Sequence, residues 1–295
     1  MKPLKIAVIG IPGKWSTEIL ADAIEQKTGF RLVLDMAEIS ADLANARLMA
    51  GDINLCELDG IMVKKISQEY SCATLDRIEL LRLAEHAGVR VFTSPEKIIR
   101  MIDRLACTMT LSNGGIPMPA TNVTENVDEA IAAVKNFGEA VFKPLYSTKA
   151  RGMCVISAEL PDDEIRSQVV DFKMDNPMMY IQQKLNLSGR DYGMVFLGGN
   201  YLGSYARVAQ SDAWNTTINS GGKYALYEPP ESTIEIASKA ESLFNMDFTT
   251  VDVADSELGP IVFEVSAFGG FKGAKEGIGI DAASLYAEYA IKELG

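Results

Sequence analysis

Apolar positions in the first third of the chain form short continuous runs that alternate with longer segments of helical spacing. The run Lys5–Gly10 has the composition of a buried strand and is followed by a Pro-Gly turn. A helix with apolar residues at helical spacing comes next and is expected to end near Gly29. Such an alternation of strands and helices is typical of a parallel α/β sheet. The remaining strands of this part are expected at Phe30–Leu34, Gly60–Val63 and Val89–Phe92, and a second helix at Thr74–Glu85.

The middle of the chain has a mixed pattern. Ser94-Pro95 predicts a helix start, because serine is a favourable N-cap and proline fits the first helical position. We expect this helix to run to Gly114-Gly115. A second helix and a hairpin follow, and the segment Leu145–Gly152 becomes the loop of that hairpin. The helix is expected near Asp128–Phe137, and the hairpin strands at Ala140–Lys143 and Met153–Ser157.

The last third is rich in strand-type segments, beginning with Met179–Gln183. Gly198-Gly-Asn200 lies between two alternating runs, which is a strong hairpin signal. A polar loop over Ala209–Lys223 precedes a helix, two further strands and a final helix from about Ala282. The hairpin strands are expected at Tyr192–Leu197 and Tyr201–Val208, the helix at Ser232–Phe244, and the later strands at Thr249–Ala254 and Ile261–Val265.

These patterns predict an α+β chain in three parts of one compact body. The parts are an α/β region at residues 1–93, a small mixed region at residues 94–178, and a strand-rich region at residues 179–295. A chain of 295 residues is long enough to bury a sizeable core over two or three subdomains.

The charge balance narrows the classes of partner. The formal net charge is −12, which repels polyanions at long range, so we expect neither nucleic-acid binding nor binding to an acidic membrane. No apolar segment approaches the ~20 residues needed to cross a bilayer. Nothing at the N-terminus resembles a signal peptide. The sequence therefore predicts a cytoplasmic protein.

Cysteine and histidine chemistry is poorly supported. The four cysteines are far apart and form no CxxC pair, and His86 is the one histidine. This pattern favours ordinary packing residues in a reducing compartment over a zinc site or a Cys/His nucleophile. A dinucleotide-binding enzyme is also disfavoured, because Gly10-Ile-Pro-Gly13 lacks the GxGxxG spacing.

Two acidic residues in the last hairpin are the first candidates for chemistry. Asp252 and Glu264 each interrupt an apolar strand, and a hairpin centred near Leu258 places them opposite one another on one face. Facing carboxylates repel and are normally stabilised by a cation or a shared proton. Oxygen ligands with room for phosphate oxygens suit Mg²⁺. The alternative is a pair of solvated acids on an exposed sheet face.

A cationic segment follows the strand of the middle region. Lys143 ends an apolar strand and precedes Pro144, so a rigid element directs its charge. Hydroxyls, cations and backbone N–H groups in the loop after it could close over a triphosphate. The alternative for Lys143 is a solvated lysine at a strand end. The loop groups are Ser147, Thr148, Lys149, Arg151 and Gly152.

The glycine-rich tail allows two interpretations. Five of the eleven residues from Gly269 to Gly279 are glycine. Lys272 and Lys275 could present cations to phosphates or to an acidic substrate. The segment could equally be a flexible connector that lets the last helix fold back.

The order of these features resembles the RimK-like ATP-grasp ligases. The resemblance runs from about Ser94 to the end of the chain and includes the metal motif with the glycine-rich segment after it. It implies an ATP-grasp fold with an N-terminal α/β domain, a central lid domain and a C-terminal antiparallel-sheet domain that carries the metal. The residues that carry it are Arg104, Gly115–Thr121, Lys143-Pro-Leu, Tyr180-Ile-Gln-Gln, Asp191, Arg207, Gly221-Gly, Asp252 and Glu264-Val-Ser-Ala.

The resemblance implies an ATP- and Mg²⁺-dependent carboxylate–amine ligase. In such an enzyme a carboxylate attacks the γ-phosphate, and an amine then displaces phosphate from the acyl-phosphate. Its partners are small-molecule or peptide substrates, and the family implies a homodimer or homotetramer. Arg207 would stabilise developing negative charge. Carried over by position, Arg104 and Lys143 would meet phosphates, Gln182, Gln183, Lys184 and Leu185 would line the adenine, Asp191 would reach the ribose, and Asp252, Glu264 and Ser266 would hold metal.

Several positions depart from the family pattern. Ser266 stands where asparagine is the usual third metal ligand, and Gly193 replaces a common arginine. Asn215 and Thr217 occupy positions where the family usually has an arginine and an asparagine. The phosphate loop has one glycine, Gly152. These departures leave open an alternative function, a catalytically weakened nucleotide-binding regulatory or scaffold protein.

Overall fold

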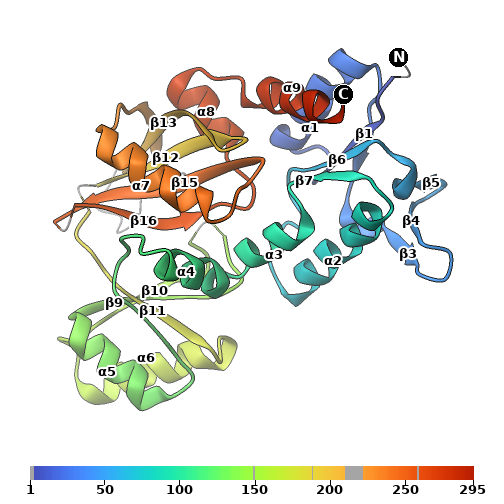
Figure 1. Cartoon of the computed structure of the whole chain (residues 1–295). Coiled ribbons are helices and arrows are strands. Elements are labelled where there is room, and N and C mark those ends of the chain that lie inside the picture. The colour runs from blue at the N-terminus through green and yellow to red at the C-terminus, as the bar shows by residue number, and fades with distance from the viewer. Residues whose placement is uncertain (1–2, 149, 188, 210–221, 258) are drawn as a thin grey trace.

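A parallel sheet forms the centre of the N-terminal part of the computed structural model. The structure describes residues 3–148, 150–187, 189–209, 222–257 and 259–295. The strands lie in the order β2-β1-β6-β7, and helices cover both faces (Figure 1). The bounds are β1 (Ile6–Ile9), α1 (Trp15–Thr28), β2 (Val33–Leu34), β6 (Gly60–Val63), α2 (Cys72–His86) and β7 (Arg90–Phe92).

Burial on both faces explains why these strands are continuous apolar runs. Ile6 and Val8 of β1 pack with α1 and with the last helix of the chain, α9 (Ala282–Leu294). Ala7 and Ile9 face the other way and pack with α2. The predicted parallel α/β sheet is therefore confirmed, and its cover includes a helix from the opposite end of the chain.

A small antiparallel ribbon lies at the edge of this part and was not predicted. Its strands pair in the order β3-β4-β5. They are too short and too polar to produce a strand-like apolar alternation. The bounds are β3 (Ser40–Asp42), β4 (Arg47–Ala50) and β5 (Ile53–Asn54), with 3₁₀ turns η1 (Met36–Glu38) and η2 (Leu55–Glu57).

The single helix expected from Ser94-Pro95 to Gly114-Gly115 is two helices. They are α3 (Pro95–Ile102) and α4 (Arg104–Asn113), with Asp103 between them in extended conformation. The Asp103 carboxylate accepts from the Leu105 N–H at 2.9 Å and caps the second helix. The prediction of one helix was wrong because the helical spacing of apolar residues continues across this cap. The break places Arg104 at the first position of α4.

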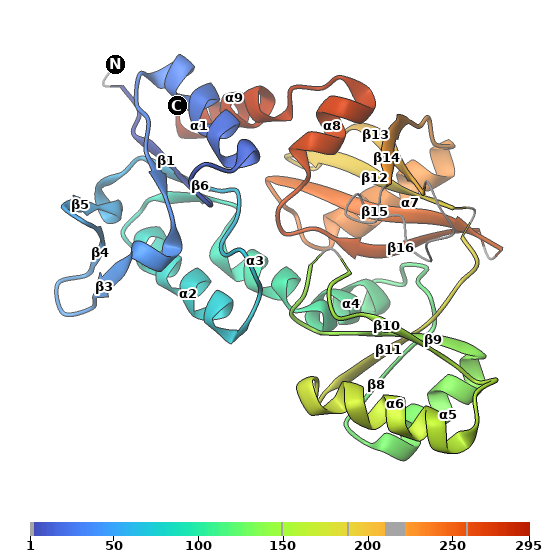
Figure 2. The same ribbon diagram turned by 180° about the vertical axis from the view of Figure 1, so that it is seen from behind.

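The central part is a layer of strands with two helices on one side (Figure 2). Its sheet has the order β10-β9-β11-β8, all antiparallel, and has a separate apolar core with α5 and α6. The bounds are β8 (Thr121–Thr124), α5 (Val127–Phe137), β9 (Glu139–Lys143), β10 (Cys154–Ser157), α6 (Asp162–Asp175) and β11 (Met179–Gln183).

Strand β11 was expected to open the third part, but it pairs with β9 and β8 in the central sheet. Its apolar residues Met179 and Ile181 belong to the core of that sheet. Helix α4, in contrast, contributes Cys107 and Leu111 to the core shared with the C-terminal sheet. We therefore propose that the central domain begins after α4 and ends after Gln183.

An antiparallel sheet in the order β14-β13-β12-β15-β16 forms the C-terminal part. Helix α7 and α4 lie on one face, and α8 lies on the other (Figure 1). No helix among the described residues is long and apolar enough to span a membrane. The bounds are β12 (Arg190–Leu197), β13 (Asn200–Val208), β14 (Lys223–Leu226), α7 (Glu231–Ser242), β15 (Phe248–Ser256), β16 (Gly259–Val265) and α8 (Phe271–Ile278).

The glycine-rich tail is a helix and not a flexible connector. Its glycines allow α8 to approach the ring of Tyr205 on β13, which is buried. A Cβ at Gly273 would lie 2.2 Å from Cζ of Tyr205, and one at Gly277 would lie 2.4 Å from its Cβ. Gly193 on the adjacent strand meets the same ring, with a Cβ position 2.4 Å from Cζ. Close packing around one aromatic ring therefore explains these glycines.

We expect Gly273→Ala to lower the free energy of unfolding by about 1–3 kcal/mol, because the new methyl group overpacks the Tyr205 contact. Urea denaturation measures the change. Lys272→Ala on the same helix is the control and should stay within about 0.5 kcal/mol of the wild type, because Lys272 is exposed. Equal effects of the two substitutions would contradict the packing role.

Candidate active site

A cluster of charged side chains lies on the face of the C-terminal sheet that α8 partly covers. Asp191 on β12 is the register partner of Arg207 on β13. Arg207 donates from Nη2 to Oδ2 of Asp191 at 2.6 Å and from Nε to Oδ1 at 3.0 Å. The same Nη2 lies 3.1 Å from Oδ2 of Asp252 on β15. Two carboxylates thus hold the guanidinium in one orientation.

One oxygen of Asp252 has no hydrogen-bond partner in the part of the chain that the structure describes. Oδ1 is buried and accepts no hydrogen bond from any described residue. Burial raises the pKa of Asp252 to about 7; Arg207 opposes this rise, and the charge of Glu264 adds to it. A carboxylate in this environment is stabilised by a cation that reaches its free oxygen.

Asp252 and Glu264 are register partners across β15 and β16, as predicted from the hairpin. Among the described residues no group of three or more His, Cys, Asp or Glu side chains could hold a metal ion. Two carboxylate donors fit a hard cation such as Mg²⁺, which readily takes its other ligands from phosphate and water. Ser266 lies just beyond β16, where its N–H donates to the Thr250 carbonyl at 2.9 Å.

Arg104 connects three parts of the site. Its Nη1 lies 3.3 Å from Oε2 of Glu264. Its Nε donates to the Pro144 carbonyl at 3.2 Å, and Nη2 donates to the Ser147 carbonyl at 3.5 Å. The arginine side chain is 12% exposed, so the start of α4 presents a nearly buried cation between the acidic hairpin and the loop after β9.

Lys143, at the end of β9, points into the same region. Its ammonium donates to Oε1 of Gln182 on β11 and lies 5.3 Å from the ring centre of Phe263. Burial lowers the pKa of Lys143 to about 7, Arg104 lowers it further, and Glu264 opposes both. The lysine has no acidic partner within hydrogen-bonding distance in the described chain, so an anionic ligand would stabilise its charged form.

The loop predicted to close over phosphates is partly described. Ser147 and Thr148 are half-buried, and the Ser147 hydroxyl has no hydrogen-bond partner among the described residues. Arg151 pairs with Glu69 of the N-terminal part at 3.1 Å. Three residues with predicted roles lie outside the described residues: Lys149 in this loop, and Asn215 and Thr217 in the polar loop.

The segment Gln182–Leu185, predicted to line adenine, begins at the C-terminal end of β11, an interior strand of the central sheet. The Gln182 side chain is buried and also donates to Thr121 and Tyr180, at 3.1 and 3.2 Å. The N–H groups of Gln183 and Lys184 donate to the carbonyls of Ala120 and Glu139. The lysine side chain pairs with Glu139 at 2.8 Å. These bonds fix the backbone of the segment, and Gln182 orients Lys143.

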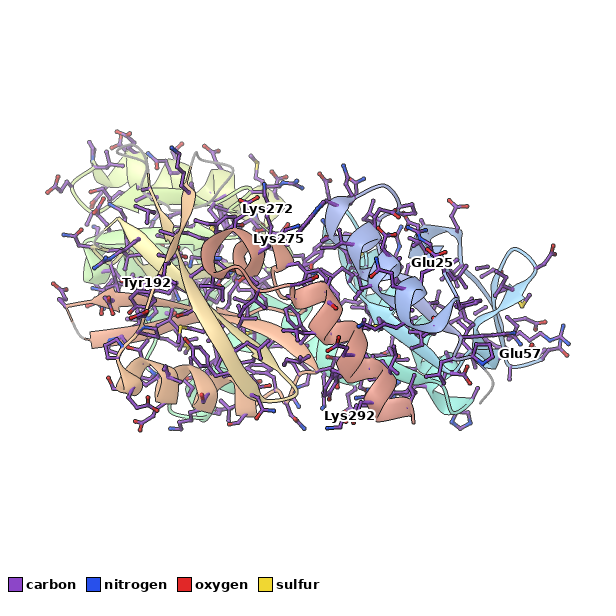
Figure 3. All side chains as sticks on the ribbon, turned by 90° about the horizontal axis from the view of Figure 1, so that it is seen from above. Glu25, Glu57, Tyr192, Lys272, Lys275 and Lys292 are labelled. Atoms are coloured by element: carbon purple, nitrogen blue, oxygen red, sulfur yellow. The ribbon has the colours of Figure 1, made fainter. Side chains whose placement is uncertain are left out.

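The tail lysines are not directed at the acidic cluster. Figure 3 labels Lys272 and Lys275 on α8. Lys272 lies 3.6 Å from Glu276 on its own helix. Lys275 lies 5.5 Å from the ring centre of Trp15, at the start of α1. Their contacts thus favour roles in the helix surface and in domain packing over phosphate binding.

Two features of the site were not predicted from the sequence. The Asp191–Arg207 pair depends on a β-bulge between Val195 and Phe196 that shifts the register of the hairpin. Tyr205 fills the space beside Gly193, where the family commonly has an arginine. The sequence signal for the packing of Tyr205 is that Gly193 and the glycines of α8 all leave room for one large side chain.

Similarity to known proteins identifies the family. The RimK-like ATP-grasp domain matches residues 101–290, so the chain belongs to the RimK-like ATP-grasp family. It is 28% identical over 273 residues to a tetrahydromethanopterin:α-L-glutamate ligase of Methanosarcina acetivorans, covering 86% of this chain and 83% of that protein. It is 26% identical over 216 residues to a ribosomal protein bS6–L-glutamate ligase of Escherichia fergusonii, covering 72% and 69%.

The fold is also that of solved ATP-grasp ligases. The structure of PsnB with its minimal precursor, Mg and ADP superposes with a TM-score of 0.75 at 17% identity, covering 100% of this chain and 99% of that one. The predicted class is therefore confirmed: the protein is an ATP- and Mg²⁺-dependent carboxylate–amine ligase. These relatives are ligases and give no support to the alternative of a weakened nucleotide-binding regulator.

Proposed function

We propose that this ligase joins the amino group of L-glutamate to an ATP-activated carboxylate of a small molecule or a peptide. The observation that carries the proposal is the buried oxygen of Asp252, which has no hydrogen-bond partner among the described residues. Asp252 is the register partner of Glu264 and is held beside Arg207. The choice of L-glutamate is supported by the names of the two curated relatives. Their acceptors, a pterin cofactor and a ribosomal protein, support the two acceptor classes.

The charged groups have distinct proposed roles. Lys143 and Arg104 neutralise the phosphates of ATP, and Ser147 and Thr148, with Lys149, belong to the loop that covers them. Asp252 and Glu264, with Ser266 as a weaker third donor, hold Mg²⁺. When bound, this ion shields the phosphate charge and polarises the transferred phosphoryl group. The chain itself supplies positioned charge, and the reaction needs no protein nucleophile.

Arg207 stabilises the negative charge that develops when the carboxylate is phosphorylated and when the amine attacks. Asp191 was predicted to reach the ribose. Its bidentate contact with Arg207 supports a different role, in which it orients the arginine. Gln182–Leu185 lines the adenine, and the fixed backbone of this segment is the support for that assignment. The homodimer or homotetramer expected from the family remains a prediction.

The experiment that tests the function follows ADP release and product mass together. A panel of carboxylates is incubated with ATP, Mg²⁺ and L-glutamate. The panel contains pterin derivatives, amino-acid derivatives, and peptides that end in glutamate. We expect ADP release that requires both substrates and an amide product of matching mass. ATP binding with no amide from any mixture would favour the regulatory alternative.

The lowered pKa of Lys143 predicts a pH dependence of ATP binding. The free lysine loses its proton near pH 7, and bound phosphate favours the protonated form, so affinity should be full below pH 7 and fall as the pH rises. One linked proton gives about a fivefold loss between about pH 7 and pH 8. Calorimetry with ATP and saturating Mg²⁺ measures it. Lys143→Arg keeps its charge and should give a flatter profile; parallel profiles for the two proteins would contradict the assignment.

A further inference from the structure

A buried lysine of the N-terminal part faces the C-terminal part and is not used by the proposed mechanism. Lys64 directly follows β6 and is buried, with 7% of its surface exposed. Its ammonium donates to the Gly269 carbonyl at 2.7 Å. It also lies 4.2 Å from the ring centre of Phe271. An ammonium has three protons to donate, and this is the one hydrogen bond that it makes within the described chain.

Lys64 lies at a place in the parallel sheet where α/β folds often bind ligands. The chain leaves β1 toward β2 on one side, and β6 lies on the other side of β1. The carboxyl ends of β1 and β6 therefore form a topological switch point, a common place for ligands in α/β sheets. The N–H of Lys64 donates to the Ile9 carbonyl at 2.8 Å, which fixes the lysine backbone at this end of the sheet.

The partner of Lys64 leads directly to the acidic hairpin. Gly269 lies against β15, where a Cβ on the glycine would be 2.9 Å from the Thr249 carbonyl carbon. The next residue, Gly270, donates from its N–H to the Thr250 hydroxyl at 3.2 Å. Asp252 follows two residues later on the same strand. The ammonium of Lys64 thus contacts, from the N-terminal part, the segment that packs on the strand of Asp252.

A cation in this environment lacks the anion that would normally stabilise it. No acidic side chain among the described residues pairs with Lys64. Burial lowers the pKa of this lysine to about 7, and Lys65 adds to the effect. Buried charges are ordinarily paired, so a group that reaches the free donor positions should be an acceptor with negative charge.

We infer that Lys64 binds a carboxylate of the acidic amino-acid substrate and thereby holds its amino group near the activated acceptor. The inference rests on the proposed function, because that function supplies an amino acid with carboxylates to neutralise. Lys64 would then be a positioning and specificity residue contributed by the N-terminal domain. A carboxylate would complete the hydrogen bonds of the ammonium without displacing the Gly269 carbonyl.

Calorimetric titration of the full chain with L-glutamate, in the presence of Mg²⁺ and a non-hydrolysable ATP analogue, tests the inference. We expect Lys64→Met to weaken L-glutamate binding about 10- to 100-fold, the usual value of a charged hydrogen bond. The affinity for the ATP analogue should be unchanged. Lys64→Arg should recover part of the loss, and Lys65→Met should show little.

Other outcomes would overturn the inference. Unchanged L-glutamate affinity in Lys64→Met, or no L-glutamate binding by the wild type, would contradict it. Parallel losses of affinity for L-glutamate and for the analogue, with a lower melting temperature, would show that Lys64 only joins the two domains. The proposed function fails separately, if the wild type binds no ATP analogue or if glutamate-dependent ADP release is absent.

Discussion

Asp252→Asn is expected to reduce ADP release at least about 100-fold, because a direct ligand to Mg²⁺ is lost. Even the loss of a residue that only hydrogen-bonds to a metal ligand lowers metal affinity about 10- to 100-fold. The fold should be kept, because Arg207 loses the charge of Asp252 but remains paired with Asp191. The wild-type carboxylate is buried with a raised pKa and one oxygen without a partner among the described residues, so its removal also removes a desolvation cost. Initial rates over a range of Mg²⁺ concentrations measure the loss, and thermal melts show whether stability is kept.

Glu257→Gln is the matched control for Asp252→Asn. It makes the same acid-to-amide change in the same hairpin, at an exposed position in the turn. This variant should keep wild-type rates and an unchanged Mg²⁺ dependence. Full activity in Asp252→Asn, or an equal loss in both variants, would contradict the assignment of the metal site.

The second large effect concerns stability and follows from Arg207→Gln. This change leaves the nearly buried carboxylates of Asp191 and Asp252 without the cation between them. Breaking a buried ion pair on one side costs about 3–5 kcal/mol of unfolding free energy. Urea denaturation should show a loss of this size, in addition to the loss of activity.

Two further measurements separate this electrostatic effect from poor packing. Without Arg207 the already raised pKa of Asp252 should rise further. A carboxyl whose pKa is raised in the folded state lowers the free energy of unfolding increasingly as the pH rises toward that pKa. Arg207→Gln should therefore be more destabilised at pH 8 than at pH 6. The added change Asp191→Asn should restore about 1–2 kcal/mol. A loss independent of pH and not relieved by Asp191→Asn would contradict the explanation.

The hairpins show how far the sequence alone could locate the site. Gly198-Gly-Asn200 correctly predicted β12 and β13, and the acidic hairpin placed Asp252 opposite Glu264. The register between Leu197 and Asn200, extended along the strands, would put Asp191 opposite Ala206 and on the wrong face. A bulge corrects this register. Bulges depend on local backbone twist, and the apolar pattern does not reveal them.

Tertiary contacts account for most of what the sequence could not predict. The Asp103 cap that divides the helix and aims Arg104 is one polar residue within a helical pattern. Strand β11 has the same apolar appearance whichever sheet it joins. Lys64 is one of two adjacent lysines after a strand, and lysines at strand ends are usually solvated. Its burial depends on Gly269, which lies 205 residues further along the chain.

The central claim is that the enzyme activates a carboxylate by phosphorylation, and transfer of oxygen isotope tests it most directly. The carboxylate that supports ADP release is labelled with ¹⁸O, and the phosphate formed with ATP, Mg²⁺ and L-glutamate is analysed by mass spectrometry. The account predicts one ¹⁸O atom in each phosphate, because the amine expels the phosphate together with the carboxylate oxygen. Unlabelled phosphate, with the label retained in the product or in the unreacted acid, would contradict it.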